Sequence, residues 1–294
     1  MMDIGRVGIW NFTLETLPAT RAQEVAAEIE ELGFKVVWIP EAVGREVFTH
    51  AGLLLAGTRR LVVASGIANI YARDPMTMAA AQKTLTEAYP DRFLLGIGVS
   101  HAPLVEGVRG HRYEKTLTKM RVYLDAMDAA PYSSPQPPVE PVRVIGALAP
   151  RMLKLAAERT AGAHPYFVPP EHTAQARQIM GDGPLLAPEQ AVVLETDATK
   201  ARDIARAHMA TYIGLPNYVN NLKRLGFTDD DVANGGSNRL VDTIVAWGDV
   251  DAIVRRVRAH HDAGANHVCV QVLPPDPREV PSQQWRELAP ALLR

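Results

Sequence analysis

Three polar side chains of this sequence stand directly after short apolar runs, at positions where strands are expected to end. Asn11 follows residues 6–10, Glu41 follows the run KVVWIP, and His101 follows FLLGIGVS. An amide, a carboxylate and an imidazole can orient a substrate or move a proton, and histidine changes its charge near neutral pH. The residue types alone leave open whether each group is functional or an ordinary polar loop residue.

Two of the apolar runs also open into glycine. Residues 61–69 contain Gly66, and residues 93–99 contain Gly96 and Gly98. Continuous apolar runs are typical of parallel strands that are buried on both faces. Glycine near a strand end permits unusual backbone angles or the close approach of a ligand. Because ligands bind at the carboxyl ends of strands in α/β proteins, these exits predict an enzyme site. The segment GIGVS lacks the third glycine of a dinucleotide fingerprint, which disfavours a classical NAD domain.

The elements that must position these groups alternate between strand and helix. We expect strands at residues 6–10, 35–40, 61–69, 93–99, 142–148, 163–168, 190–195 and 267–273. We expect helices at residues 21–32, 49–57, 75–89, 113–130, 150–161, 171–181, 251–263 and 283–293, and one that begins at Thr199. Asp74 is the expected cap of the third helix, with Pro75 in its first turn. Eight strands alternating with helices predict a (β/α)8 TIM barrel, and a doubly wound open sheet is the alternative.

Two segments interrupt the alternation. Residues 131–141 are rich in proline and predict an irregular loop. Residues 214–248 hold short helical pieces and are expected to be an insertion before the last β/α unit, where they could form a lid. Because the same unit resumes after each interruption, we expect residues 1–294 to form a single barrel domain.

Composition excludes several classes of protein. A net charge of −2 with scattered basic residues makes nucleic acid an unexpected partner. Cys269 is the only cysteine and lies within an apolar run, which favours a small core residue in a reducing cytoplasm. The N-terminus lacks the pattern of a signal peptide, and no stretch is apolar enough to span a membrane. HExxH, CxxC and GxSxG are absent, so we expect no metal and disfavour a hydrolase.

Four segments together resemble one known family. The segments GIANIYARDP, FLLGIGVSHAP, VIGALAPRMLKLAAERTAG and AGANHVCVQVLP are similar to the luciferase-like flavin and deazaflavin oxidoreductases. The similarity is strongest to the actinobacterial branch that depends on coenzyme F420. It covers nearly the whole chain in matching order and is weakest over residues 214–248.

The resemblance implies a barrel whose strand ends hold the cofactor. It places a non-prolyl cis peptide at Gly66–Ile67, behind the cofactor ring. The positions that it implies near the ring are Glu41, Ser65, Gly66, Ile67 and Asn69. It implies that Gly98, Val99, Ser100 and His101 lie beside the pyrimidine and side chain, and Gly146, Ala147, Leu148 and Ala149 near the phosphate. It also implies that Trp10, Asn11 and Tyr71 shape the substrate pocket.

The activity expected from this resemblance is hydride transfer between F420 and a small organic substrate. Either His101 or Glu41 would donate or accept the proton of the reaction. His101 stands where some relatives carry a glutamate. One alternative is an FMN-dependent two-component monooxygenase that receives reduced flavin from a partner reductase. A second alternative is a barrel that binds flavin without catalysis. The family resemblance also implies a homodimer formed through helices beside the second and third strands.

Overall fold

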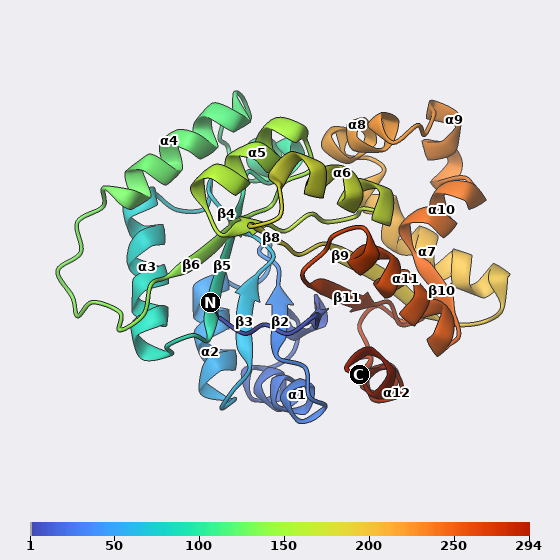
Figure 1. The fold of residues 1–294 in the computed structure, drawn as a ribbon, viewed down its shortest axis with the longest axis horizontal. Coiled ribbons are helices and arrows are strands. Elements are labelled where there is room, and N and C mark those ends of the chain that lie inside the picture. Colours follow the sequence, from blue (N-terminus) through green and yellow to red (C-terminus); the bar gives the residue numbers. More distant parts are fainter. Residues whose placement is uncertain (1) are drawn as a thin grey trace.

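The strands form one curled sheet with helices around it (Figure 1). The computed structural model describes residues 2–294, and the strand pairings in that range are parallel. The strands are β1 (Val7–Trp10), β2 (Val36–Ile39), β3 (Val62–Ser65), β4 (Ala68–Asn69), β5 (Phe93–Gly98), β6 (Val142–Ile145), β7 (Gly162–Ala163), β8 (Leu185–Leu186), β9 (Glu189–Leu194), β10 (Ala246–Gly248) and β11 (Val268–Val272). Their order is β10-β9-β11-β1-β2-β3-β5-β6-β7-β8, and β4 pairs with β5.

The last strand of this order, β8, runs directly into β9 near the other end, because the two are consecutive parts of one extended segment. On one side of the segment, the N–H of Ala187 donates to the carbonyl of Ala163 at 2.9 Å. On the other side, the N–H of Cys269 donates to the carbonyl of Pro188 at 2.9 Å. The sheet therefore curls back on itself. This arrangement is consistent with the predicted TIM barrel, whereas an open doubly wound sheet has two free edges.

Helices connect successive strands on the outside of the sheet (Figure 1). They are α1 (Ala19–Glu31), α2 (Val47–Ala56), α3 (Pro75–Ala88), α4 (Thr116–Asp128), α5 (Pro150–Arg159), α6 (Pro170–Met180), α7 (Ala198–Tyr212), α8 (Pro216–Arg224), α9 (Asp229–Val232), α10 (Asn238–Ile244), α11 (Val250–Asp262) and α12 (Ser282–Leu292), with two short 3₁₀ turns, Thr13–Glu15 and Ala233–Gly235, and the π-helix η2 (Pro103–Val108). The predicted cap of α3 is confirmed, because Asp74 accepts a hydrogen bond from the N–H of Thr77 at 3.0 Å. None of the helices among residues 2–294 is long and apolar enough to cross a bilayer.

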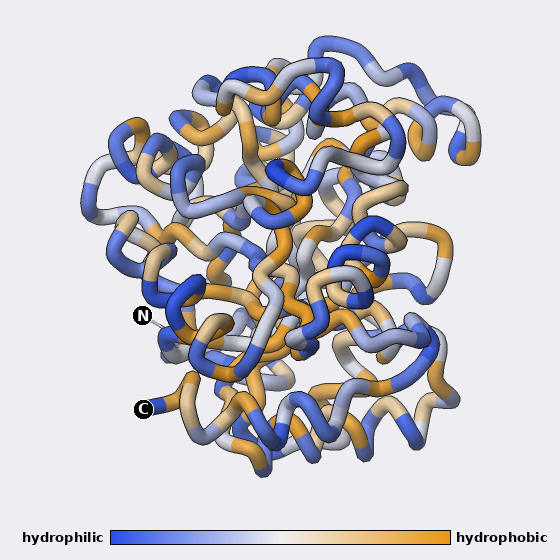
Figure 2. Tube along the Cα trace, turned by 90° about the vertical axis from the view of Figure 1, so that its right-hand side faces the viewer, coloured by the Kyte–Doolittle hydropathy of each residue, from blue (hydrophilic) through white to orange (hydrophobic). Residues whose placement is uncertain are grey.

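Apolar side chains form two layers, one inside the curled sheet and one between the sheet and the helices. The inner layer includes Trp10, Trp38, Leu94, Val144 and Cys269, so the predicted burial of the cysteine is confirmed. The outer layer is larger and is contributed by alternate strand residues and by the inner faces of the helices. Figure 2 shows hydrophobic segments mostly toward the centre of the trace and hydrophilic ones mostly at its surface.

The structure departs from the expected elements most clearly in four places. The third strand is divided into β3 and β4, and the expected strand 163–168 is reduced to β7. The π-helix η2 and the strand β10 were not expected. Strand β10 is hard to predict because it is only three residues long and exists through its pairing with β9.

The two interrupting segments differ in structure. Residues 131–141 contain no helix or strand, as predicted, and bulge from the left side of Figure 1. Residues 214–248 contain α8, α9 and α10. Helices α8 and α10 pack with α7 around an apolar cluster of their own, which includes Tyr212, Tyr218, Leu222 and Leu240. The helices of this segment thus form an ordered layer, whereas its last three residues are the sheet strand β10.

Candidate active site

The predicted cis peptide is present between Gly66 and Ile67, and it divides β3 from β4. At this break the side-chain hydroxyl of Ser65 links β3 to β5 by hydrogen bonds. The hydroxyl donates to the carbonyl of Gly96 at 2.8 Å and accepts from the N–H of Gly96 at 2.9 Å. Ser65 is therefore buried within the sheet, where it holds the break in place.

The side chain of Ile67 lies over the glycines that end β5 and follow β6. A β-carbon on Gly98 would come within 2.7 Å of Ile67, and one on Gly146 within 3.0 Å. Ile67 is itself only partly buried. The glycines at these exits therefore make room for Ile67, which brings three strand ends together at one point.

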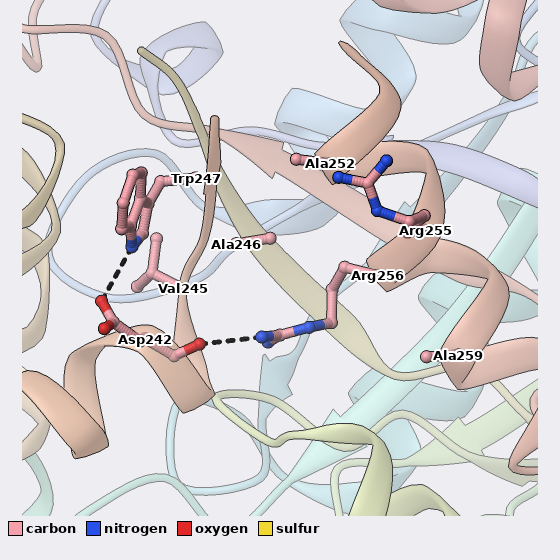
Figure 3. Close-up of a pocket in the computed structure, with 8 residues that line it drawn as sticks. All are labelled: Asp242, Val245, Ala246, Trp247, Ala252, Arg255, Arg256 and Ala259. Atoms are coloured by element: carbon pink, nitrogen blue, oxygen red, sulfur yellow. Dashed lines mark hydrogen bonds between the residues drawn. The ribbon is translucent and has the colours of Figure 1, made fainter. Parts of the chain in front are cut away.

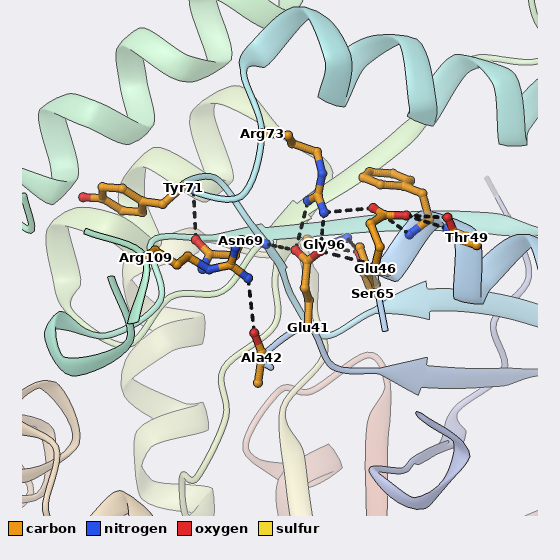
Figure 4. Close-up of polar contacts among 12 residues, drawn as sticks. Glu41, Ala42, Glu46, Thr49, Ser65, Asn69, Tyr71, Arg73, Gly96 and Arg109 are labelled. Atoms are coloured by element: carbon orange, nitrogen blue, oxygen red, sulfur yellow. Dashed lines mark hydrogen bonds and ion pairs between the residues drawn. The ribbon is translucent and has the colours of Figure 1, made fainter. Parts of the chain in front are cut away.

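Glu41 accepts hydrogen bonds from several donors and is almost completely buried (Figure 4). Its carboxylate accepts from the N–H of Asn69 at 2.7 Å and of Val47 at 3.4 Å. The Arg73 guanidinium donates twice to it, once at 2.9 Å and once in a shorter contact. The side chains of Glu41 and Arg73 are 4% and 9% exposed, so this is a buried ion pair.

Arg73 also forms an ion pair with a second carboxylate. Glu46, the N-terminal cap of α2, contacts the guanidinium at 2.9 Å. Burial opposes the charge on Arg73, but the hydrogen bonds and charges of Glu41 and Glu46 outweigh it and raise the pKa of the guanidinium. The sequence analysis did not single out Arg73, although it lies within the segment YARDP that carries the resemblance.

His101 contacts the helical layer. Its Nδ1–H donates to the side-chain oxygen of Asn217 in α8 at 3.0 Å, and its ring lies 5.2 Å from that of Tyr218. Burial lowers the pKa of His101, and the hydrogen bond to Asn217 opposes this effect. The preceding residue, Ser100, has a left-handed backbone with φ of 56°, and its carbonyl accepts from the hydroxyl of Tyr113 at 2.9 Å. Glu41 and His101 thus have separate sets of partners.

The three expected pocket residues lie in different surroundings. Trp10 is buried beside Tyr166, with ring centres 5.0 Å apart. The side-chain oxygen of Asn11 accepts from the N–H of Leu14 at 2.9 Å, so Asn11 holds the turn after β1. Tyr71 lines a hollow of about 450 Å³ at the mouth. Of the three, only Tyr71 lies on this open space.

The segment after β6 leads directly into α5. The N–H of Gly146 donates to the carbonyl of Ile97 at 2.8 Å, and Ala147 is buried. The carbonyl of Leu148 accepts from Nε2 of His172 at 2.9 Å. Ala149 precedes the first turn of α5, which Pro150 begins as predicted. Val99, at the neighbouring exit, packs partly buried against the outer core.

A polar cluster deeper in the barrel was not predicted. The hydroxyl of Tyr166 hydrogen-bonds that of Tyr212 at 2.9 Å and donates to the side chain of Gln271 at 2.8 Å. Glu189 is completely buried, and one of its oxygens accepts from the N–H of Phe167 at 3.0 Å while the other has no partner. Burial raises the pKa of Glu189 to about 8. These residues belong to no recognisable motif, so only the folded chain reveals them.

Several buried polar atoms around the bulge have no partner. They are Nδ2 of Asn69, Nε1 of Trp10 and Nε2 of His164. A β-carbon on Gly66 would lie within 2.6 Å of the Trp10 nitrogen and 2.9 Å of the His164 nitrogen. Buried polar groups normally have partners, so these atoms are exceptions, packed against the bulge and closed to solvent. Among residues 2–294, no group of three or more His, Cys, Asp or Glu side chains is placed to hold a metal ion.

A second hollow, of about 370 Å³, lies between α10, β10 and α11 (Figure 3). Its polar groups are largely paired with one another. The carboxylate of Asp242 accepts from Nε1 of Trp247 at 2.8 Å, and the carbonyl of Asp242 accepts from Arg256 at 2.8 Å. This hollow is therefore a joint between secondary-structure elements and offers little to a ligand.

Comparison with known families accounts for this combination of fold and bulge. Residues 6–267 match the family described as luciferase-like monooxygenase. The chain belongs to this family, as the resemblance indicated.

Individual relatives are distant but cover the full length. The chain is 25% identical to a Mycobacterium tuberculosis protein with the provisional name coenzyme F420-dependent oxidoreductase Rv3520c, over 92% of this chain and 94% of the relative. It is also 25% identical to 5,10-methylenetetrahydromethanopterin reductase of Archaeoglobus fulgidus, over 96% and 99% of the two chains.

Solved structures share the fold. An F420-dependent secondary alcohol dehydrogenase, solved with an F420-acetone adduct, has a TM-score of 0.78 at 16% identity and covers 98% of both chains. The F420-dependent tetrahydromethanopterin reductase of Methanopyrus kandleri has the same TM-score at 18% identity, over 98% of this chain and 100% of its own. A type II Baeyer–Villiger monooxygenase of Pseudomonas putida, in complex with FMN, has a TM-score of 0.69 at 14% identity, over 97% and 95%.

Proposed function

We propose that this chain is an oxidoreductase that transfers a hydride between coenzyme F420 and a small organic substrate. The observation that carries the proposal is the packing of Ile67 against Gly98 and Gly146, which brings the exits of β3, β5 and β6 together. The names of the relatives Rv3520c and the Archaeoglobus reductase support F420 as the cofactor. When bound, F420 supplies a carbon centre that gives or takes a hydride, which favours two-electron chemistry.

The residues around the bulge fit such a cofactor. Ile67 would lie behind the ring, and the buried Asn69 would support the bulge from below. We assign the rest of the cradle to Ser65, Gly66, Gly98, Val99 and Ser100, with Gly146, Ala147, Leu148 and Ala149 toward the phosphate. The first turn of α5 supports the phosphate assignment, because the helix dipole favours an anion there.

We assign the transfer of the substrate's proton to His101. With its pKa lowered by burial, the imidazole is neutral near pH 7. Because Nδ1–H donates to Asn217, Nε2 is the nitrogen that can accept a proton from an alcohol substrate. In the reverse direction, the protonated imidazole returns that proton to the oxygen of a carbonyl substrate.

For Glu41 we propose a positioning role. Its carboxylate accepts from Arg73 and from the backbone of Asn69, so it fixes the segment that follows the bulge. These donors and the N–H of Val47 engage both carboxylate oxygens of Glu41. Trp10 and Asn11 would support the pocket wall from behind, whereas Tyr71 faces the hollow.

We propose that residues 214–248 are the inserted segment and cover the substrate. The support is that His101 hydrogen-bonds to Asn217 and that its ring lies 5.2 Å from that of Tyr218, both in α8. Any substrate that reaches His101 would therefore lie close to this helical layer.

The two alternatives make different predictions about binding. The family description and the FMN complex of the Pseudomonas enzyme favour an FMN-dependent monooxygenase with a partner reductase. A non-catalytic flavin-binding barrel is disfavoured by the histidine at the β5 exit, for which such a barrel has no use. A homodimer through α2 and α3, the helices after the second and third strands, is also proposed, and light scattering would measure it.

The deciding experiment is a fluorescence titration of the purified protein with F420 and with FMN. We expect saturable F420 binding with weaker FMN binding, and loss of F420 affinity in Gly98→Ala. Reduced F420 should then be reoxidised by a ketone or aldehyde substrate under anaerobic conditions. Tight FMN binding without any response to F420 would refute the proposal in favour of the monooxygenase.

A further inference from the structure

The backbone that carries His101 leaves β5 in an unusual conformation. Ser100, the residue before it, has a φ of 56°, in the left-handed region. A residue with a β-carbon is unfavourable in this region, where glycine is the usual choice. Such a conformation persists in a non-glycine residue only where the surrounding structure holds it. The direction in which the chain presents His101 therefore depends on what holds Ser100.

A tyrosine from the other end of the same loop supplies that hold. The hydroxyl of Tyr113 donates to the carbonyl of Ser100 at 2.9 Å, and among residues 2–294 it is the only hydrogen-bond partner of Ser100. One hydrogen bond contributes a free energy similar to the cost of a left-handed residue that is not glycine. Burial raises the pKa of Tyr113 to about 12, so the hydroxyl keeps its proton at neutral pH and remains a donor.

Tyr113 is itself anchored by the loop that it closes. The π-helix η2 lies between His101 and Tyr113, and the carboxylate of Glu106 in this helix accepts from the N–H of Tyr113 at 2.9 Å. The N–H of Val105 donates to the carbonyl of His101 at 3.0 Å. The carbonyls of Ser100 and His101 are thus both bound within one loop. Turns of π-helix are rare and often occur at functional sites.

The side chain of His101 is held from a different part of the molecule. Its Nδ1–H donates to Asn217 of α8 at 3.0 Å, whereas the loop holds only its backbone. The imidazole can reach Asn217 only while the loop presents it toward α8. The hydrogen bond of Tyr113 and the contact with Asn217 therefore act together on the orientation of one ring.

We propose that Tyr113 is a positioning residue of the active site, which acts through the carbonyl of Ser100 to orient the imidazole of His101. The inference rests on the proposed function, since it concerns the histidine to which that function assigns the proton transfer. Tyr113 contacts the backbone before His101, so this role needs no contact between Tyr113 and the substrate.

The test compares Tyr113→Phe with the double variant Ser100→Gly/Tyr113→Phe. The first change removes only the hydroxyl, and the second adds a glycine, which adopts the left-handed backbone without a steric penalty. Nitrogen NMR of the His101 ring, without cofactor or substrate, reports which ring nitrogen carries the proton, and this depends on the hydrogen-bond partners of the ring. We expect the Nδ1–H form in the wild type, a mixture of both forms in Tyr113→Phe, and the wild-type spectrum in the double variant.

Tyr132→Phe is the matched control. Its hydroxyl hydrogen-bonds that of Thr84 at 3.3 Å, in the loop of residues 131–141. Removal of this hydroxyl should leave the spectrum of the His101 ring as in the wild type.

A kinetic measurement separates positioning from binding. With reduced F420 and with cyclohexanone or hexanal as probe substrates, Tyr113→Phe should lower kcat by about tenfold. The KM of the probe should change by less than about twofold, because a misdirected proton donor affects the reaction more than the binding of the substrate.

Three results would overturn the inference. The first is a His101 spectrum in Tyr113→Phe that equals that of the wild type. The second is a changed spectrum that Ser100→Gly does not restore, which would mean that Tyr113 acts by another route. The third is an unchanged kcat in Tyr113→Phe while the wild type turns over F420. If the spectra change as expected while F420 neither binds nor is turned over, the positioning role is confirmed and the proposed oxidoreductase function fails.

Discussion

The side chain of Ile67 occupies the space that a β-carbon of Gly98 would need. The separation would be only 2.7 Å, although Ile67 lies between β3 and β4 and Gly98 ends β5. Gly98 pairs with Asn69 in β4, so the side chain that follows the cis peptide is held directly over the exit of β5. The position of Ile67 therefore depends on the absence of a side chain in a neighbouring strand.

Adding that side chain should displace Ile67. We expect Gly98→Ala to destabilise the fold by about 1–3 kcal/mol, because overpacking forces neighbours to move. Gly96→Ala should be worse, because its β-carbon would meet the backbone carbonyl of Ser65, which cannot rotate away. Urea unfolding of each variant measures the change.

Gly107→Ala is the matched control for both variants. A β-carbon there meets nothing within 4 Å, so we expect a change within about 0.5 kcal/mol. Equal stability of all three variants would contradict the assigned packing of Ile67.

The buried ion pair of Glu41 and Arg73 should be sensitive to loss of one partner. Arg73→Met leaves the Glu41 carboxylate buried without its counter-ion, and we expect a loss of about 3–5 kcal/mol in the free energy of unfolding. The double variant Glu41→Gln/Arg73→Met should lose less than the sum of the two single changes, because no isolated charge remains.

The exposed pair of Arg21 and Glu24 provides the comparison. Its side chains are 52% and 58% exposed, so Arg21→Met should change stability by less than about 1 kcal/mol. Chemical denaturation measures both changes. If Arg73→Met and Arg21→Met lowered the free energy of unfolding by similar amounts, burial of the Glu41–Arg73 pair would contribute nothing to stability.

His101 should titrate below its usual range. Burial lowers its pKa, so the imidazole should remain neutral down to below pH 6.5, and a reaction that uses it as a base should slow only at lower pH. Asn217→Asp places a carboxylate against Nδ1 and should raise the pKa, which shifts the loss of activity to higher pH. An NMR titration of the His101 ring measures the pKa without any substrate.

The same charge placed elsewhere on α8 separates this effect from a general one. Asn220 is exposed on that helix, so Asn220→Asp should leave the His101 titration nearly unchanged. Equal shifts in both variants would argue against a direct contact with Asn217.

Glu189 should make stability depend on pH. Its folded-state pKa of about 8 lies above the ordinary value of 4.5, so the folded protein binds the proton more tightly than the unfolded chain. The stabilisation is fully present below pH 4.5 and is lost as the pH rises toward 8, with a slope of up to about 1.4 kcal/mol per pH unit. Glu189→Gln stays neutral and should flatten this part of the curve.

The control for that measurement is Glu87→Gln, which changes an exposed carboxyl on α3. It should leave the pH dependence of urea unfolding as in the wild type. An unchanged slope in Glu189→Gln would mean that the carboxyl is hydrated or paired in solution.

The sequence by itself predicted the alternation of strands and helices and the polar residues at the strand exits. These features depend on local physics: runs of apolar residues, a cap such as Asp74, and glycine where a strand ends. The location of the cis peptide followed from the family resemblance, and the structure has it at the expected bond.

The tertiary structure decided what each exit residue contacts. Glu41 pairs with Arg73, 32 positions away, and His101 with Asn217, 116 positions away. The burial of Glu189 likewise depends on the strand and loop that close around it. No local pattern encodes such partners, because they meet only when the sheet has curled and the helical layer has packed over its open end.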